Sequence, residues 1–225
     1  MTREELANDL ITTLCNEEAF KRFMEEKFSF LKENFRYRNE LWENPNLIEN
    51  VYPYGGYVRD KIAGVEFNDI DIWINTSIFL NTRILIEYLK YTGFEVIYLF
   101  KDKDYGLNGS ESKTVIREAV EISKDDGIRV SVDFCSGYSK TPFVNPDADV
   151  NSFSLHGGEL RYNVFSGLME FDRDLLCNRF ISEQYPVKED MEAFQNIKSR
   201  RCRLLKGVSS NRIEKIEYNG YEIIT

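Results

Sequence analysis

Three aspartates of this 225-residue chain lie in patterns that suit metal-ion chemistry. Asp69 and Asp71 belong to the run DIDIWI at 69–74, in which apolar residues recur at every second position. The alternation predicts a strand with its three isoleucines on one face and both carboxylates on the other. Like charges this close repel, so a bound cation would stabilise the pair. Neighbouring carboxylate oxygens suit Mg²⁺, with Mn²⁺ as the alternative.

A third carboxylate, Asp133, lies in a second alternating run, IRVSVDF at 128–134. The apolar residues of this run share one face, and Asp133 shares the other with Arg129 and Ser131. If the two predicted strands are neighbours in one sheet, the three aspartates can converge on a metal pair, as in two-metal phosphoryl transfer. The alternative is a solvent-facing aspartate on an ordinary strand.

An anion site is predicted just before the first acidic strand. Gly55 and Gly56 carry no Cβ, so a ligand can approach the backbone there. A short helix is predicted over 57–63, and Gly64 is expected to end it. The start of a helix offers free N–H groups and a positive dipole end to an anion. A phosphate cradle followed by a carboxylate-bearing strand is what phosphoryl or nucleotidyl transfer requires.

The stretch 54–75 resembles a signature of the polymerase-β-like nucleotidyltransferase superfamily. The resemblance is to the head domain of class II tRNA nucleotidyltransferases and poly(A) polymerases. There the pattern is GGxVRD, a leucine-rich helix and then D-x-D on a strand; here it is GGYVRDKIAG followed by NDIDIWI. The resemblance implies an α+β fold in which a small mixed sheet of about five strands carries the acidic cluster and helices flank it. The alternative is an ordinary strand–turn–helix unit with an exposed acidic strand.

The resemblance also implies roles for individual residues. Mg²⁺ or Mn²⁺ would be held by three catalytic carboxylates: Asp69, Asp71 and Asp133. A nucleoside triphosphate would be bound by a second set: Gly55, Gly56, Arg59, Asp60 and Asn151. Two interpretations of Arg59 stay open, a contact with phosphate or a structural ion pair with Asp60. Asp133 would complete a second metal site or receive the proton of the acceptor hydroxyl.

Two later segments match the family pattern in part. PDADVNSF at 146–153 resembles the motif RDFTINAL, with Asp147 and Asn151 in place but Pro146 where the motif has Arg. The neck motif Glu-Asp-x-x-Arg corresponds to EDMEA at 189–193, which ends in Ala instead. These departures are consistent with a catalytically silent relative that binds nucleotide or a protein partner. The three carboxylates favour an enzyme, because a silent site has no physical need for clustered charge.

The composition indicates a folded globule, with 42% hydrophobic and 14% aromatic residues. The net charge of −9 argues against a protein that grips long nucleic acid through a wide basic surface. Five basic residues do gather within 198–206, where they would either hold phosphates or complement the C-terminus of a helix. No run is long enough to cross a membrane and residues 1–10 lack the apolar core of a signal peptide, so we expect a cytoplasmic protein without a membrane partner.

Three segments are expected along the chain. Residues 1–46 form a helical segment that opens with a capping box at Thr2 and breaks near 15–17. Residues 47–182 form the head, and residues 183–225 a helical, neck-like segment that closes in a hairpin at Asn219-Gly220.

Within the head, residues 101–113 are expected to form a loop, and the runs 114–122 and 128–134 a hairpin. His156, the only histidine, is expected in a surface loop. The four cysteines lack metal-ligand spacing, so we expect reduced thiols.

The predicted function is metal-dependent transfer of a nucleotidyl group from a nucleoside triphosphate to an RNA end or another hydroxyl acceptor. Besides the silent relative, a toxin-like or regulatory transferase that modifies a protein or an RNA end stays open. A processive polymerase is disfavoured, because it would need a wide basic track.

Overall fold

The computed structural model describes residues 1–34, 46–75, 82–104, 115–124, 127–136, 148–172, 177–204, 208 and 210–224. The described strands of the main sheet are β1 (Val51–Tyr54), β2 (Asp69–Ile74), β3 (Glu95–Asp104), β4 (Val115–Ser123), β5 (Arg129–Ser136), β6 (Phe153–His156), β7 (Glu159–Asp172) and β8 (Cys177–Pro186). Their order is β3-β4-β5-β2-β1-β6-β7-β8. Of these pairs, β2–β5 is parallel and the rest are antiparallel.

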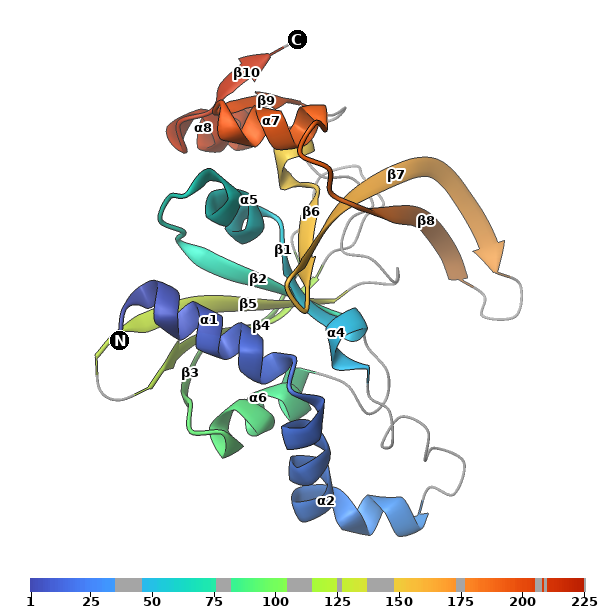
Figure 1. Cartoon of the computed structure of the whole chain (residues 1–225). Helices are drawn as coiled ribbons and strands as arrows, with labels where there is room; N and C mark the ends of the chain where they lie inside the picture. Colours follow the sequence, from blue (N-terminus) through green and yellow to red (C-terminus); the bar gives the residue numbers. More distant parts are fainter. Residues whose placement is uncertain are drawn as a thin grey trace.

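The remaining described elements are mostly helical. They are α1 (Arg3–Leu14), α2 (Glu17–Asn34), α4 (Leu47–Asn50), α5 (Gly56–Ala63), α6 (Thr82–Tyr91), the 3-10 helix η1 (Asp149–Asn151), α7 (Glu192–Lys198), β9 (Arg201–Arg203), α8 (Ser210–Tyr218) and β10 (Glu222–Ile224). The predicted α+β class, a mixed sheet flanked by helices, is confirmed (Figure 1). None of the described helices is both long and apolar enough to span a lipid bilayer.

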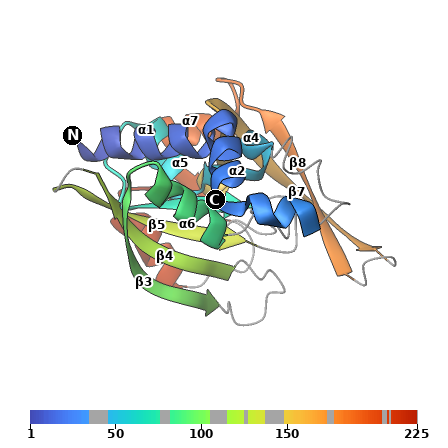
Figure 2. The same cartoon turned by 90° about the horizontal axis from the view of Figure 1, so that it is seen from below.

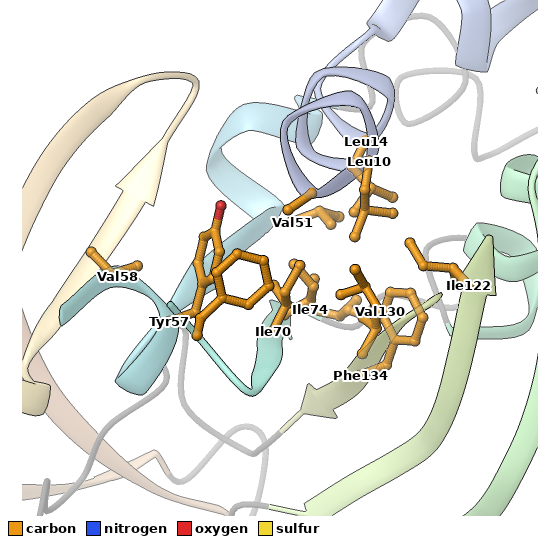
Figure 3. Close-up of a cluster of buried hydrophobic side chains, with 14 of the residues drawn as sticks. Leu10, Leu14, Val51, Tyr57, Val58, Ile70, Ile74, Ile122, Val130 and Phe134 are labelled. Atoms are coloured by element: carbon orange, nitrogen blue, oxygen red, sulfur yellow. The ribbon is translucent and has the colours of Figure 1, made fainter. Parts of the chain in front are cut away.

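Helices α1 and α6 cover one face of the sheet (Figures 1 and 2). The alternation in β2 and β5 supplies that face with fully buried side chains, Ile70, Ile72 and Ile74 from β2 and Val130, Val132 and Phe134 from β5. Leu10 and Leu14 of α1 pack against this layer (Figure 3). Because burying each such side chain is worth about 1.5–3 kcal/mol, this core fixes which face of β2 is left for the aspartates.

The N-terminal helices begin and break where the sequence predicts. The side chain of Thr2 accepts a hydrogen bond from the Glu5 N–H while Glu5 reaches back to the Thr2 N–H, which completes the capping box. α1 ends at Leu14 and α2 starts at Glu17.

The sheet is larger than predicted, because residues 159–172 and 177–186 form the long antiparallel pair β7–β8. Residues 101–104, predicted as loop, extend β3; residues 105–113 lie outside the described part of the chain. Residues 47–50 form the single turn α4 before β1.

The predicted C-terminal hairpin is wrong. Asn219-Gly220 ends α8 instead, with Gly220 at φ 81° and the Tyr221 N–H donating to the Ile216 carbonyl, as in a Schellman motif. The chain then enters β10, which pairs in parallel with β9. Within the segment 183–225, which was expected to be helical, α7 stops at Lys198 and gives way to β9.

Candidate active site

The parallel pair β2–β5 brings the three predicted carboxylates onto one face of the sheet. Asp71 lies directly opposite Asp133, and Asp69 lies opposite Ser131. Neighbouring strands are about 4.8 Å apart, so the Asp71 and Asp133 side chains leave the sheet next to one another. The strand contact on which the predicted convergence depended is therefore present.

The pKa of Asp71 is clearly raised by this arrangement. Burial, together with the charges of Asp69 and Asp133, raises the pKa of Asp71 from 3.8 to about 7. Arg212 and Lys215 of α8 act in the opposite direction. Their charges therefore reach this site, a role that the sequence analysis missed because it assigned this segment to a hairpin. The i,i+3 spacing of the two cations on one helix face is the signal that could have indicated it.

The donor set fits a hard divalent cation. It consists of carboxylate oxygens only, and besides burial the negative charges of Asp69 and Asp133 raise the pKa of Asp71, a repulsion that a bound cation would relieve. Among the described residues, no three His, Cys, Asp or Glu side chains converge closely enough to hold a metal ion by themselves. Mg²⁺ commonly uses one or two carboxylates and completes its shell with water and substrate phosphates, so the Asp71–Asp133 pair meets its requirement.

The Gly-Gly turn lies beside these carboxylates. Tyr54, the last residue of β1, is opposite Asp71, and Gly55 follows directly. Gly55 has φ 66° and ψ −130°, a conformation that favours glycine, and its N–H donates to the Phe153 carbonyl at 2.9 Å. α5 then begins at Gly56, and the first N–H groups of a helix have no acceptor within it. Free backbone donors therefore start next to the acidic pair.

Arg59 forms the structural ion pair that was one of its two interpretations. The side chain is 5% exposed. Its Nε and Nη2 each lie 2.7 Å from Asp60 Oδ1, and its Nη1 donates to Asn151 Oδ1 at 2.9 Å. The structure thus brings together Arg59, Asp60 and Asn151, and joins α5 to η1. Their contact with a nucleotide stays a prediction.

An apolar floor lies on the acidic face, where sequence alternation alone indicates a polar surface. A cluster of buried side chains fills it: Tyr52, Tyr54, Trp73, Ala119 and Cys135. The Tyr54 and Trp73 rings meet edge to face, with centroids 6.1 Å apart. This floor excludes water from one side of Asp71, which is the physical cause of its desolvation.

The prediction that His156 lies in a surface loop is wrong. His156 ends β6, is 2% exposed, and has its Nε2 3.1 Å from Ser154 Oγ. Its ring centroid is 3.7 Å from that of Tyr52. The Gly-Gly pair at 157–158 joins β6 to β7 and was the overlooked signal, because a two-residue glycine turn is typical of a hairpin.

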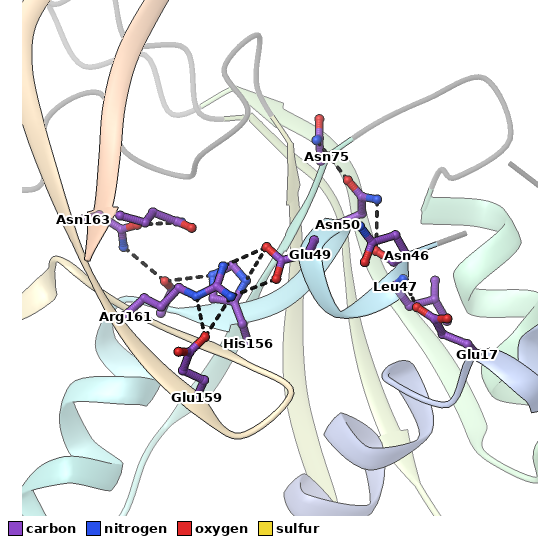
Figure 4. A network of polar contacts seen from close by, with 12 residues as sticks. Glu17, Asn46, Leu47, Glu49, Asn50, Asn75, His156, Glu159, Arg161 and Asn163 are labelled. Atoms are coloured by element: carbon purple, nitrogen blue, oxygen red, sulfur yellow. Dashed lines mark hydrogen bonds and ion pairs between the residues drawn. The ribbon is translucent and has the colours of Figure 1, made fainter. Parts of the chain in front are cut away.

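A charged network closes over this histidine at the sheet surface (Figure 4). Arg161 binds both oxygens of Glu49, at 2.7 and 2.8 Å, and also pairs with Glu159. Glu49 Oε2 lies 3.8 Å from His156 Nδ1. Burial, followed by the charge of Arg161, lowers the pKa of His156 from 6.5 to about 4.

Several basic residues of 198–206 have structural partners. Lys198 donates to the Ile62 carbonyl at 2.8 Å, and Arg203 pairs with Glu192 at 2.8 Å. Arg200 lies over the ring of Tyr221. Lys206, and likewise Pro146 and Asp147 of the second motif, lie outside the described residues. Cys15, Cys135 and Cys202 are free thiols.

Comparison with known proteins finds similarity at the level of structure only. No family model and no curated protein matches the sequence. A CCA-adding enzyme in apo form I is 15% identical over 84% of this chain and 41% of its own, with a TM-score of 0.42. The Thermotoga maritima CCA-adding enzyme complexed with tRNA is 15% identical over 84% of this chain and 40% of its own, with a TM-score of 0.39.

A tRNA nucleotidyltransferase complexed with a primer tRNA and an incoming ATP analogue is 14% identical over 78% of this chain and 43% of its own, with a TM-score of 0.40. The chain thus spans about two fifths of the length of these proteins. The likeness is partial, and the functional assignment rests on the chain's own residues.

Proposed function

We propose that this chain is a metal-dependent nucleotidyltransferase that transfers a nucleotidyl group from a nucleoside triphosphate to an RNA end or another hydroxyl acceptor. One observation carries the proposal. Asp71 lies opposite Asp133 on one side and opposite Tyr54 on the other, so the acidic pair adjoins the Gly-Gly turn. A carboxylate pair and a set of free N–H donors at one point of a sheet suit a metal-bound triphosphate.

Asp71 and Asp133, with Asp69 beside them, would hold Mg²⁺. When bound, this ion neutralises phosphate charge and favours the deprotonated form of a coordinated hydroxyl. In the transfer, the acceptor oxygen forms a bond to the α-phosphorus, the bond from that phosphorus to the bridging oxygen breaks, and pyrophosphate leaves. Asp133 would either complete the metal site or, if it is not bound to the ion, receive the acceptor proton; the first N–H groups of α5 would bind phosphate oxygens.

The proposal is tested by titrating each ribonucleoside triphosphate with and without Mg²⁺ into the wild type, Asp71→Asn and Asp133→Asn. The matched control is Glu25→Gln, which removes an exposed carboxylate of α2. We expect Mg²⁺-dependent binding in the wild type and control, and at least tenfold weaker binding in both Asn variants. Equal binding by all four proteins would refute the site.

A second candidate, a catalytically silent nucleotide-binding protein, is favoured by one observation: no three acidic side chains converge among the described residues. Incorporation of labelled nucleotide into the 3′ end of a short RNA separates the two. Incorporation that is lost in Asp133→Asn supports the transferase. Tight Mg²⁺-dependent binding without incorporation into RNA, protein or small hydroxyl acceptors supports the silent protein.

A further inference from the structure

Tyr221, which follows α8, has two arginine side chains close to its ring. Its ring centroid is 5.2 Å from Arg59 Cζ and 5.3 Å from Arg200 Cζ. The tyrosine is 3% exposed, so these contacts are shielded from water. A guanidinium within about 6 Å of an aromatic ring is attracted to it, and the attraction is strongest where both are desolvated.

The backbone fixes the ring in this position from both sides. Gly220 ends α8 with φ 81°, and the Tyr221 N–H donates to the Ile216 carbonyl at 3.3 Å. The next N–H, that of Glu222, donates to the Arg200 carbonyl at 2.8 Å and starts β10. Arg200 itself has φ 56°, a left-handed conformation that costs a non-glycine residue about 1 kcal/mol. The backbone is therefore strained at Arg200, the residue whose side chain contacts the ring.

Tyr221 adds an aromatic contact to the hydrogen bonds of Arg59. Asp60 and Asn151 hold nitrogens at the edge of the guanidinium. Tyr221 covers a face, a direction in which those hydrogen bonds give little restraint. The guanidinium also lies beside the Gly-Gly turn, because a Cβ built on Gly56 would stand 3.7 Å from Arg59 Nη2. The place of this cation relative to the turn thus depends on the ring.

We propose that Tyr221 is a positioning residue that holds Arg59 next to the Gly-Gly turn, and that the short segment joining α8 to β10 is thereby part of the triphosphate site. The inference rests on the proposed function, since the ligand is the polyphosphate of a nucleoside triphosphate. Asp60 offsets part of the Arg59 charge, and Arg200 brings a second positive charge to the ring. Both cations then contribute to the potential at the turn.

The test compares two substitutions of Tyr221. Tyr221→Leu removes the ring and frees Arg59 to move, so the Kd for Mg²⁺-ATP, measured by calorimetry, is expected to rise about tenfold. Tyr221→Phe keeps the ring and removes only the hydroxyl, and its Kd is expected to stay within about twofold of the wild type. A Phe variant that loses as much affinity as the Leu variant overturns the proposal.

Ile216→Ala is the matched control for a merely structural effect. Ile216 is 2% exposed in α8, so its truncation loosens the same C-terminal segment while leaving the ring in place. We expect both Ile216→Ala and Tyr221→Leu to lower Tm, but only Tyr221→Leu to raise the Kd. If the Kd rises in both variants in proportion to the fall in Tm, the positioning role of Tyr221 is overturned.

Two further outcomes are decisive. If Tyr221→Leu does not fold, Arg200→Gln tests the same stack from its more accessible side; a Kd raised two- to threefold supports the proposal and an unchanged Kd overturns it. If the wild type binds no triphosphate at all, the proposed function fails first. If instead the wild type and Tyr221→Leu bind ATP equally well, only the positioning role of Tyr221 is refuted and the proposed function stands.

Discussion

The buried imidazole of His156 predicts a loss of stability in mild acid. Burial and the Arg161 charge lower its pKa to about 4, whereas Glu49 opposes that shift. In the unfolded chain the imidazole titrates near its ordinary pKa of 6.5. Between these two values the unfolded state binds more protons than the native state, so the free energy of unfolding falls as the pH falls. The stabilisation that the neutral, buried imidazole contributes to the native state is fully present above pH 6.5 and is lost as the pH falls to about 4.

The size of the effect follows from the gap between the two pKa values. A shift from 6.5 to about 4 corresponds to about 3 kcal/mol over the whole window, and to about 2 kcal/mol between pH 7 and pH 5. The imidazole is only 2% exposed, so solvent screens it little. For a domain of marginal stability, 2 kcal/mol is a large share of the total.

The measurement is urea unfolding of the wild type and His156→Gln at pH 7 and pH 5. Asp71, whose pKa is about 7, also titrates in this range, but it is common to both proteins, so its contribution cancels in the difference. We expect the wild type to lose about 2 kcal/mol more than the variant. Because the chain has one histidine, its NMR titration gives the native pKa directly. A native pKa near 6.5, or equal losses in both proteins, refutes the reasoning.

Three further predictions concern the site and the first helix. Asp71→Asn removes the central like charge of the cluster, so in EDTA its free energy of unfolding should exceed that of the wild type by about 1–2 kcal/mol, as measured by urea unfolding; a less stable variant would contradict the electrostatic account. Gly55→Ala places a side chain at φ 66° and should lower the free energy of unfolding by about 1–3 kcal/mol. Gly56→Ala, whose new Cβ meets its nearest atom at 3.7 Å, should lower it by less than about 1 kcal/mol in the same assay. Equal losses would show that the backbone at Gly55 is unstrained. Thr2→Ala breaks the capping box of α1 and should lower the free energy of unfolding by about 1 kcal/mol, while an unchanged value would mean that the first turn frays in the wild type.

Local sequence patterns were sufficient to predict the faces of a strand and the ends of helices. The alternation in 69–74 assigns the faces of β2, because moving the register by one residue would put its isoleucines in water. Gly64 ends α5 in a left-handed conformation, as predicted. The capping box at Thr2 is likewise a matter of four consecutive residues. Each of these signals involves neighbours in sequence, where periodicity carries information.

The errors occur where distant segments decide the outcome. Asn219-Gly220 is typical of a hairpin, yet pairing of β10 with β9 turns it into the end of a helix. His156 is buried because β6 lies between β1 and β7; the glycine pair at 157–158 indicates the hairpin with β7, but no local pattern shows the contact with β1. The apolar floor around Tyr54 and Trp73 also depends on strand order. Repulsion from a neighbouring carboxylate was expected from the sequence, but the part of the Asp71 pKa shift that comes from burial depends on that floor and could not be predicted.

The parallel pairing of β2 with β5 has a consequence for how the site comes into being. β2 and β5 are far apart in the sequence, with α6, β3 and β4 between them, so closing this contact costs loop entropy before any of it is regained. A fragment that contains only one of the two strands lacks either Asp71 or Asp133 and so cannot form the carboxylate pair. A cation that needs Asp71 and Asp133 together therefore binds the native chain alone, and its binding free energy adds directly to that of folding. In the cell, the concentration of the free ion would then help to set how much of this protein is folded.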